Sequence, residues 1–340
     1  MTQDNPMREV IAAQNDPVGG LTSDPIAAGT DAATTTATPT SAAPAAEAPR
    51  AKRVTQRQLI RRRFLRNKPA VVGMAVILAM FAMAWVVPNF LPWRYDQLDN
   101  NAFYAPPGTG NHLLGTTQAG ADVLALTMRG LSKSLIIGFM VALLQTSIAA
   151  LVGSSVAYIG GVYQTAMMWI VDLLLVIPSF FLIAIVTTGG PKGPHAWLLL
   201  VALLAFFGWP LSSRVVRSMS MSVKEREYVQ AAKYMGLSTT KTLIRHIIPN
   251  ISSMLIVDAC LGVGYAILAE AGLSFFGFGV QAPDTSLGTL IAEGQQTATT
   301  FPWIFLAPAT FLVILVMCVN AIGDGLRDAL DPNSMSGGRA

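Results

Sequence analysis

The sequence predicts an all-α polytopic membrane protein with six transmembrane helices. Hydrophobic residues make up 52% of the 340 residues and charged residues only 12%, about half of the roughly 25% that is typical of soluble domains. Mean hydropathy is +0.50, although the first fifty residues are polar. Six apolar runs are each long enough to cross about 30 Å of hydrocarbon as a helix. A soluble chain of this length would need far more charge to cover its surface.

The six predicted spans follow a polar N-terminal region. They cover residues 70–93, 134–158, 166–188, 196–216, 251–271 and 302–322. Pro178 and Pro210 lie inside the third and fourth spans, where proline can kink a helix. Residues 94–133 and 272–301 are predicted to be long external loops. The core of the protein, with spans two to six, is expected over residues 134–332.

The N-terminal residues 1–51 differ in composition from the rest of the chain. The first fifty contain no Phe, Trp or Tyr and are rich in Ala, Thr and Pro, so they bury too little apolar surface to offset the entropy of ordering. This predicts a disordered cytoplasmic tail, then a basic cytoplasmic segment at 52–69 and transmembrane helix 1 at 70–93. That first span is too long and too far from the N-terminus for a cleaved signal peptide. Residues 333–340 are expected to form a short C-terminal tail.

Lys and Arg are distributed unequally between the two sides that six spans would create. Nineteen of the 23 basic residues fall in the N-terminal region, in the connection at residues 219–250, at the end of the fourth span, or in the segment after the sixth span. The predicted external segments hold only Arg94, Arg129, Lys133 and Lys192. Basic residues favour cytoplasmic loops, so we expect a multi-pass protein of the cell (inner or plasma) membrane with both termini in the cytoplasm. Because the charges are segregated by loop, no nucleic-acid partner is expected.

Cysteine and histidine usage argues against a disulfide framework or a metal site. Cys260 and Cys318 both lie in apolar spans, where a small buried side chain is the ordinary role. His112, His195 and His246 lie in three separate connections, too scattered to share a metal ion. His112 is expected to be an ordinary loop histidine held by its own turn.

The long cytoplasmic connection between the fourth and fifth spans is predicted to contain two short helices. Ser222 and Glu225 have the spacing of a capping box, which would begin a helix of about three turns, and Gly236 would end that helix. Ser238 could cap a second helix that Pro249 would stop. From the residues alone, such a hairpin either only connects two spans or docks on a partner.

ATP hydrolysis is not expected on this chain. The sequence has no G-x-x-x-x-G-K-[ST] pattern, whose backbone amides cradle nucleotide phosphates. An intramembrane hydrolase would need a nucleophile with a base in reach, but Gly272-Leu-Ser-Phe lacks the G-x-S-x-G form, and no histidine lies in the centre of a span. Without a family resemblance, an ATP-driven permease and an ion-coupled secondary transporter would be equally open.

The connection between the fourth and fifth spans resembles the EAA loop of ABC-importer permeases, which has the form E-A-A-x3-G-x9-I-x-L-P. Here the pattern is Gln230-Ala-Ala-Lys-Tyr-Met-Gly236, followed after nine residues by His246-Ile-Ile-Pro249. Gln230 replaces Glu, His246 replaces the first Ile and Ile248 replaces Leu. Similar substitutions are common in the peptide-importer branch, and the Ala pair, the Gly and the Pro keep their spacing.

Three further segments resemble signatures of dipeptide and oligopeptide permeases. They are His112-Leu-Leu-Gly-Thr116 with Gly120-Ala-Asp122, then Glu270-Ala-Gly-Leu-Ser-Phe-Phe-Gly-Phe-Gly-Val-Gln-Ala-Pro283, and Gly323-Asp-Gly-Leu-Arg-Asp-Ala-Leu-Asp-Pro332. Thr117, Ala121 and Leu287 stand where those signatures usually have Asp, Arg and Trp. With four matches in the same order, the chain resembles the second, C-type transmembrane subunit of a dipeptide/oligopeptide ABC importer. Such subunits belong to the binding-protein-dependent transport inner-membrane component family.

The resemblance implies a MetI-like ABC-importer permease fold, with cytoplasmic coupling helices between helices 4 and 5. It implies three kinds of partner besides the lipid bilayer: a homologous second permease subunit in a heterodimer, two ABC ATPase subunits, and an extracytoplasmic solute-binding protein. The chain itself would carry no cofactor, because ATP and Mg would be bound by the ATPase subunits. Alternating access would import di- or oligopeptides, although related permeases carry nickel, haem or glutathione. An ion-coupled secondary transporter remains the alternative.

Two sets of site residues follow. The resemblance implies that contact with the ATPase involves Glu227, Tyr228, Gln230, Ala231, Ala232, Gly236 and Pro249. The ionisable residues in or beside the spans are candidates for the translocation pathway, and they are Asp172, Asp258 and Glu270. Such carboxylates could steer a peptide's ammonium terminus. Alternatively, Asp172 and Asp258 pair with Ser, Lys or backbone groups and only fix the packing.

Overall fold

The computed structural model describes residues 56–190 and 193–330, which all belong to one compact unit, Val54–Ala340. Regular structure in this part of the chain is helical apart from three isolated antiparallel bridges. The predicted all-helical class is confirmed. The predicted tails at residues 1–51 and 333–340 lie outside the described residues.

Within residues 56–190 and 193–330, five helices are long and apolar enough to cross a membrane. They are Lys68–Asn89, Val123–Ile159, Ala196–Lys224, Thr239–Phe275 and Pro302–Leu330. A sixth candidate is a bent pair, α4 (Gly161–Val176) and α5 (Ser179–Gly189), whose axes differ by 76°. The count is therefore five spans, or six if the bent pair is one span, against six predicted.

The bend in the third predicted span lies at Pro178. The preceding residue, Ile177, is extended with φ −67° and ψ 127°, and Pro178 occupies the N-cap position of α5. Proline disfavours the helical conformation of the residue before it, which explains the break. The predicted kink is thus a full interruption. Helix α6 (Ala196–Lys224), in contrast, continues through Pro210.

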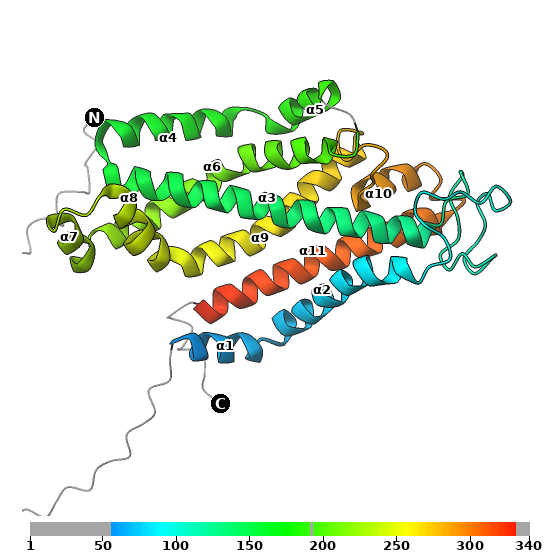
Figure 1. Cartoon of the computed structure of the whole chain (residues 1–340), viewed down its shortest axis with the longest axis horizontal. Helices are drawn as coiled ribbons and strands as arrows, with labels where there is room; N and C mark the ends of the chain where they lie inside the picture. Colours follow the sequence, from blue (N-terminus) through cyan, green and yellow to red (C-terminus); the bar gives the residue numbers. More distant parts are fainter. Residues whose placement is uncertain (1–55, 191–192, 331–340) are drawn as a thin grey trace, which may run out of the picture. The chain divides into compact units, whose positions relative to one another are not determined.

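Helix α3 (Val123–Ile159) runs the length of the bundle (Figure 1) and contributes to each of the three hydrophobic clusters found among the described residues. Its first half, with Leu131, packs against α2 (Lys68–Val86), α9 (Ile248–Phe275) and α11 (Pro302–Leu330). Its middle, with Ile137 and Val141, packs against α5, α6 and α9. Its last turns, with Ala149, join a cluster that reaches the short helices after α6. The chain is therefore built around one long helix.

The chain turns before the first long helix. Helix α1 (Gln56–Arg66) ends before Asn67, whose side-chain oxygen accepts from Ala70 N–H at 3.2 Å, and α2 begins at Lys68. Pro69 lies in the first turn of α2, where backbone amides have no acceptor within the helix. The missing amide hydrogen of proline therefore costs no hydrogen bond there. A single 3₁₀ turn, η1 (Val87–Asn89), continues α2 at its far end.

Two predicted loops contain more helix than the sequence indicated. Helix α3 begins at Val123, with the Asp122 carboxylate accepting from Ala125 N–H at 2.7 Å, so residues 123–133 are helical. After α9, the short helix α10 (Leu287–Gln295) lies within the predicted loop, and Ser286 Oγ accepts from Thr289 N–H at 3.1 Å at its start. A search for long apolar runs missed both helical segments, because amphipathic helices are not apolar enough to count as membrane spans.

The capping box predicted after the fourth span is wrong. Helix α6 runs on to Lys224, so Ser222 lies inside it rather than at a new N-terminus. Helix α7 (Glu227–Tyr234) has Arg226 at its N-cap position, without a side-chain bond, and is eight residues long rather than about three turns. Extending the existing helix α6 through Ser222 costs less free energy than nucleating a new helix there, because propagation is easier than nucleation.

Pro249 does not stop the second short helix as predicted. Helix α8 (Thr239–Thr242) continues through a π-helical segment, η2 (Leu243–Ile247), directly into α9, in whose first turn Pro249 lies. A π turn shifts the hydrogen-bond register by one residue, which accommodates a residue without an amide hydrogen. Ser238 does occupy the predicted N-cap position, but its side chain makes no capping bond.

Candidate functional site

A short hairpin formed by α7 and α8 projects at one end of the helix bundle (Figure 1). On its inner side, Val229 and Ala232 are almost fully buried. Val229 packs in the same cluster as Leu243 and Ile247 of η2 and as residues near the end of α6. The hairpin is therefore fixed to α6 and, through η2, to the start of α9 by apolar contacts.

The turn between α7 and α8 is closed by a Schellman motif. Leu237 N–H donates to Ala232 O at 3.1 Å and Gly236 N–H donates to Lys233 O at 3.0 Å. Gly236 has φ +76°, a left-handed conformation that favours glycine at this position. A β-carbon there would meet no atom within 4 Å, so the requirement for glycine is conformational rather than steric.

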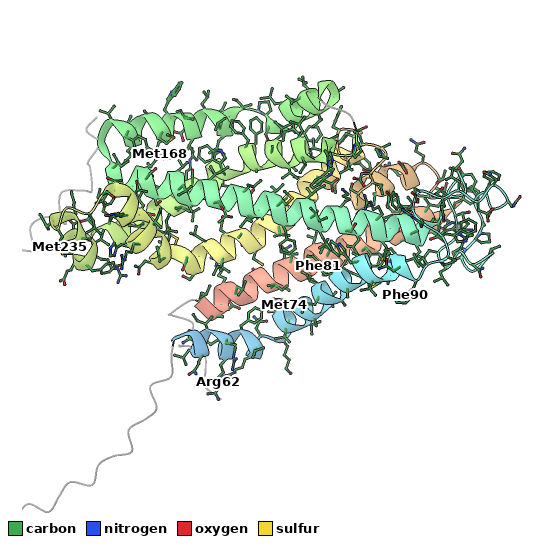
Figure 2. The ribbon with its side chains drawn as sticks, in the orientation of Figure 1. Arg62, Met74, Phe81, Phe90, Met168 and Met235 are labelled. Carbon is green, nitrogen blue, oxygen red and sulfur yellow. The ribbon has the colours of Figure 1, made fainter. Side chains whose placement is uncertain are left out.

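The outer face of the hairpin exposes large apolar side chains. The exposed fractions are 40% for Tyr228, 87% for Tyr234, 73% for Met235 and 58% for Ile244. Figure 2 shows Met235 at this end of the chain. Beside them is a shallow cavity of 490 Å³, lined by Leu237, Thr240, Lys241, Ile244 and Arg245. An exposed apolar patch with basic residues is typical of an interaction surface.

The seven residues predicted for ATPase contact do not all lie on this outer face. Glu227, Tyr228, Ala231, Gly236 and Pro249 are exposed. The half-buried Gln230 instead donates from Nε2 to Lys224 O at 2.9 Å, which ties α7 to the end of α6. Ala232 is buried under the hairpin. The sequence pattern therefore combines exposed residues with residues that hold the hairpin in place, and it does not contain Tyr234, Met235 or Ile244 as functional positions.

The three predicted pathway carboxylates lie in separate environments. Asp172 of α4 forms an exposed ion pair with Arg214 of α6. Asp258 and Glu270 lie on the same helix, α9, twelve residues apart, which is about 18 Å along the axis. The structure does not bring the three together.

Asp258 lines a cavity. Ser212 Oγ of α6 donates to it at 3.0 Å and Thr146 Oγ1 of α3 donates at 3.2 Å. The cavity, of 280 Å³, lies between α6 and α9 and is mainly apolar, with Arg327 of α11 at its wall. Asp258 belongs to none of the ion pairs found in the described part of the chain.

Glu270 is fully buried in a network of hydroxyl groups. Ser274 Oγ donates to its carboxylate at 2.5 Å and Ser134 Oγ of α3 donates at 3.4 Å. Ser134 Oγ also accepts from Leu287 N–H, the first residue of α10, at 3.2 Å. Glu270 therefore joins α3, α9 and α10.

A largely buried charge cluster around Asp284 could not be seen in the apolar pattern of the sequence. Asp284 accepts from Arg129 Nε at 2.9 Å and pairs with Lys133 Nζ at 2.7 Å. Arg129 also lies over the Tyr95 ring and Lys133 over the Trp197 ring, at 4.7 and 4.4 Å from the centroids. The signal in the sequence was the spacing of Arg129 and Lys133, which share one face only if residues 123–133 are helical.

His112 has more partners than an ordinary loop histidine. Its backbone N–H donates to Thr109 O at 2.9 Å, as expected for a turn. Its buried ring lies 2.8 Å from the Asp122 carboxylate and 3.5 Å from that of Asp99, and it stacks on Trp93 at 4.9 Å. The ring thereby fixes the loop before α3 to the residue that caps α3.

These features define the class: a polytopic helical membrane protein with a packed helical hairpin at one end of its bundle. The chain belongs to the family described as binding-protein-dependent transport system inner membrane components, whose profile matches residues 145–335. The profile of the N-terminal TM domain of oligopeptide transport permease C matches residues 55–107. The resemblance inferred from the four motifs is confirmed, and a member of this family is a transport permease rather than an enzyme.

Several relatives cover most of the chain. The oligopeptide transport system permease protein OppC of Mycobacterium tuberculosis (strain H37Rv) is 54% identical over 271 residues, which is 80% of this chain and 92% of the relative. The proteins of the same name from Haemophilus influenzae and Bacillus subtilis are 37% and 36% identical, over 78% of this chain and 85% and 86% of theirs. None of these matches supports an ion-coupled carrier.

Proposed function

We propose that this chain is the C-type permease subunit of an ATP-driven importer of oligopeptides or dipeptides. The observation that carries the proposal is the 54% identity to an oligopeptide transport permease over 92% of that protein's length. Peptides are chosen over nickel, haem or glutathione because three of the similar proteins are named for oligopeptide transport.

The assembly is proposed to contain a homologous second permease, two ATPase subunits and a solute-binding protein. The family description, which specifies binding-protein-dependent transport, supports the last of these. ATP and Mg would be bound by the ATPase subunits, since this chain has no phosphate-binding loop of the Walker type. The excess of basic residues around residues 219–250 and in the N-terminal region supports cytoplasmic placement of both termini.

The hairpin of α7 and α8 is proposed to be the coupling element. A groove on an ATPase would receive the exposed apolar side chains around Gly236, a helix-in-groove contact. Its buried inner face packs against α6 and η2, so movement of the ATPase would displace α6 and α9 together. Such rigid-body motion would alternate the opening of the spans between the two membrane faces.

Asp258 is proposed as the pathway residue that meets a peptide ammonium group. Its support is a cavity wall position, two hydroxyl donors and the absence of an ion pair within the residues described. Asp172 and Glu270 are better explained as packing groups, because Asp172 is paired with Arg214 and Glu270 is fully buried.

Substitution of Gly236 tests the coupling proposal. Residues with a β-carbon pay roughly 1–2 kcal/mol for the left-handed conformation, and Asn and Asp adopt it more readily than the others. Gly236→Asp adds a negative charge to the docking face, whereas Gly236→Asn is the matched control. We expect Gly236→Asp to lower ATP-dependent peptide uptake about tenfold, equivalent to about 1.4 kcal/mol, at an unchanged level of protein in the membrane, while Gly236→Asn retains most uptake. Equal uptake by the wild type and Gly236→Asp would refute the role of the hairpin.

A further inference from the structure

Helix α1 carries a concentrated positive charge that the transport function does not use. It contains five arginines within Gln56–Arg66 and no acidic residue. Asp and Glu are absent from the whole sequence between Lys52 and Trp93. A charge of one sign without neighbouring acids in the sequence indicates an anionic partner.

The inner side of α1 is fixed to the bundle. Phe64 packs against the cluster formed by α2, α3, α9 and α11. Directly after α1, Asn67 caps α2 and donates from Nδ2 to Asp328 of α11 at 3.4 Å. In Figure 1, α1 turns away from the direction of α2 and lies beside the C-terminal end of α11. These contacts fix the position of α1 against the bundle and leave its other face directed outward.

The outward face interleaves arginines with leucines. Arg61, Arg62 and Arg66 are exposed, and Leu59 and Leu65 are exposed to 42% and 58%. Figure 2 shows Arg62 directed away from α11. Arginine guanidinium groups bind phosphate oxygens in a bidentate manner, whereas exposed leucines suit the boundary between headgroups and acyl chains.

The position of α1 beside a membrane span indicates that phosphate groups bound by its arginines would belong to lipid headgroups. Only Asn67 separates it from α2, a 19-residue apolar helix that is a candidate membrane span. The arginines therefore lie at the level where a span leaves the hydrocarbon. We propose that the outward face of α1, with Arg61, Arg62 and Arg66, is a binding surface for the headgroups of anionic phospholipids in the adjacent leaflet. This inference is independent of the transported solute and of the coupling role of the hairpin.

The test measures binding of fluorescent phosphatidylglycerol to the full chain, purified in mild detergent with any subunits that stay bound. Each basic residue at an anionic membrane surface contributes about fivefold in binding. The variant Arg61→Gln/Arg62→Gln/Arg66→Gln should therefore raise the Kd for phosphatidylglycerol about a hundredfold, with phosphatidylcholine binding unchanged. Wild-type affinity should fall as salt is added, because exposed charges are screened.

Two further variants separate charge from folding and from total net charge. Arg61→Lys/Arg62→Lys/Arg66→Lys keeps the charges and should retain most of the affinity. Lys233→Gln/Lys241→Gln/Arg245→Gln removes three exposed charges from the hairpin instead and should leave phosphatidylglycerol binding unchanged. Unchanged lipid affinity in the glutamine variant of α1 overturns the proposal. So does loss of a bound protein subunit at unchanged lipid affinity, which would assign the face to an acidic protein surface.

Discussion

Asp258 combines two features that bear on a pathway role: it lines a cavity of 280 Å³, and it belongs to none of the described ion pairs. Sequence reasoning could identify all three predicted pathway carboxylates as ionisable groups in apolar surroundings. It could not rank them, because the ranking depends on Arg214 reaching Asp172 and on hydroxyls enclosing Glu270. The contacts of Arg214 with Asp172 and of Ser134 with Glu270 join helices that are far apart in the sequence.

Replacing Asp258 by Asn should impair transport more than it impairs folding. The amide oxygen can still accept from Ser212 and Thr146, so packing is kept, while the negative charge that would meet an ammonium group is lost. We expect uptake to fall several-fold, chiefly through a raised KM, with normal protein in the membrane. The matched variant Asp172→Asn breaks an exposed pair worth about 0–1 kcal/mol and should transport normally. Equal uptake by both variants would remove Asp258 from the pathway.

The Asp284 carboxylate is the counter-ion for two cations that the sequence analysis assigned to a loop. The substitution Asp284→Asn removes the negative charge that Arg129 and Lys133 share. In this site the Lys133 and Asp284 side chains are only 10% and 8% exposed. Removing one partner of a buried pair costs roughly 3–5 kcal/mol. We therefore expect a clearly lowered Tm for the detergent-solubilised protein.

The surface pair of Arg94 and Asp96 provides the control for Asp284. Its side chains are 68% and 51% exposed, and exposed pairs contribute about 0–1 kcal/mol. Asp96→Asn should hardly change the Tm. If the two variants melt alike, the cluster around Asp284 has no structural importance.

At the scale of elements, apolar windows identified the spans but not where the helices end. Helices α3 and α6 extend beyond the predicted spans into polar sequence, and α10 has no counterpart in the prediction. Hydropathy measures membrane burial, whereas helix length is set by capping and by packing on neighbours. The interruption at Pro178 was within reach of the sequence, since proline acts locally on the residue before it. The π turn before Pro249 was not, because nothing in the sequence specifies a change of register.

The crossing of α3 and α6 depends on the absence of a side chain at Gly153. A β-carbon there would lie 2.6 Å from the backbone oxygen of Ser213, so the two helices must separate to accept it. Gly153→Ala should destabilise the protein by about 1–3 kcal/mol, the usual cost of overpacking. Gly272 in α9 has no atom within 4 Å of such a carbon, and Gly272→Ala should be neutral or stabilising by up to about 1 kcal/mol. Thermal unfolding of both variants checks this, and a Gly153→Ala variant at least as stable as Gly272→Ala would contradict the described crossing.

At the scale of the whole molecule, composition and motif order were sufficient for the class, and the family matches confirm it. The role of α3 as the helix shared by three hydrophobic clusters could not be predicted, since an apolar helix does not reveal which neighbours cover it. Orientation in the membrane stays a prediction from charge distribution. The hairpin was predicted from its small residues and turn glycine, while its exposed Tyr234, Met235 and Ile244 emerge only once buried and exposed faces are known.

The central claim is that the outer face of the α7–α8 hairpin contacts an ATPase subunit. The most direct measurement places a photo-crosslinking amino acid at Tyr234, irradiates native membranes, and identifies the adduct by mass spectrometry. Phe90, 81% exposed against 87% for Tyr234, lies beyond the far end of α2 (Figure 2) and is the matched control position. The account predicts an ATPase adduct from position 234 and none from position 90. No ATPase adduct from position 234, or equal adducts from both positions, would contradict it.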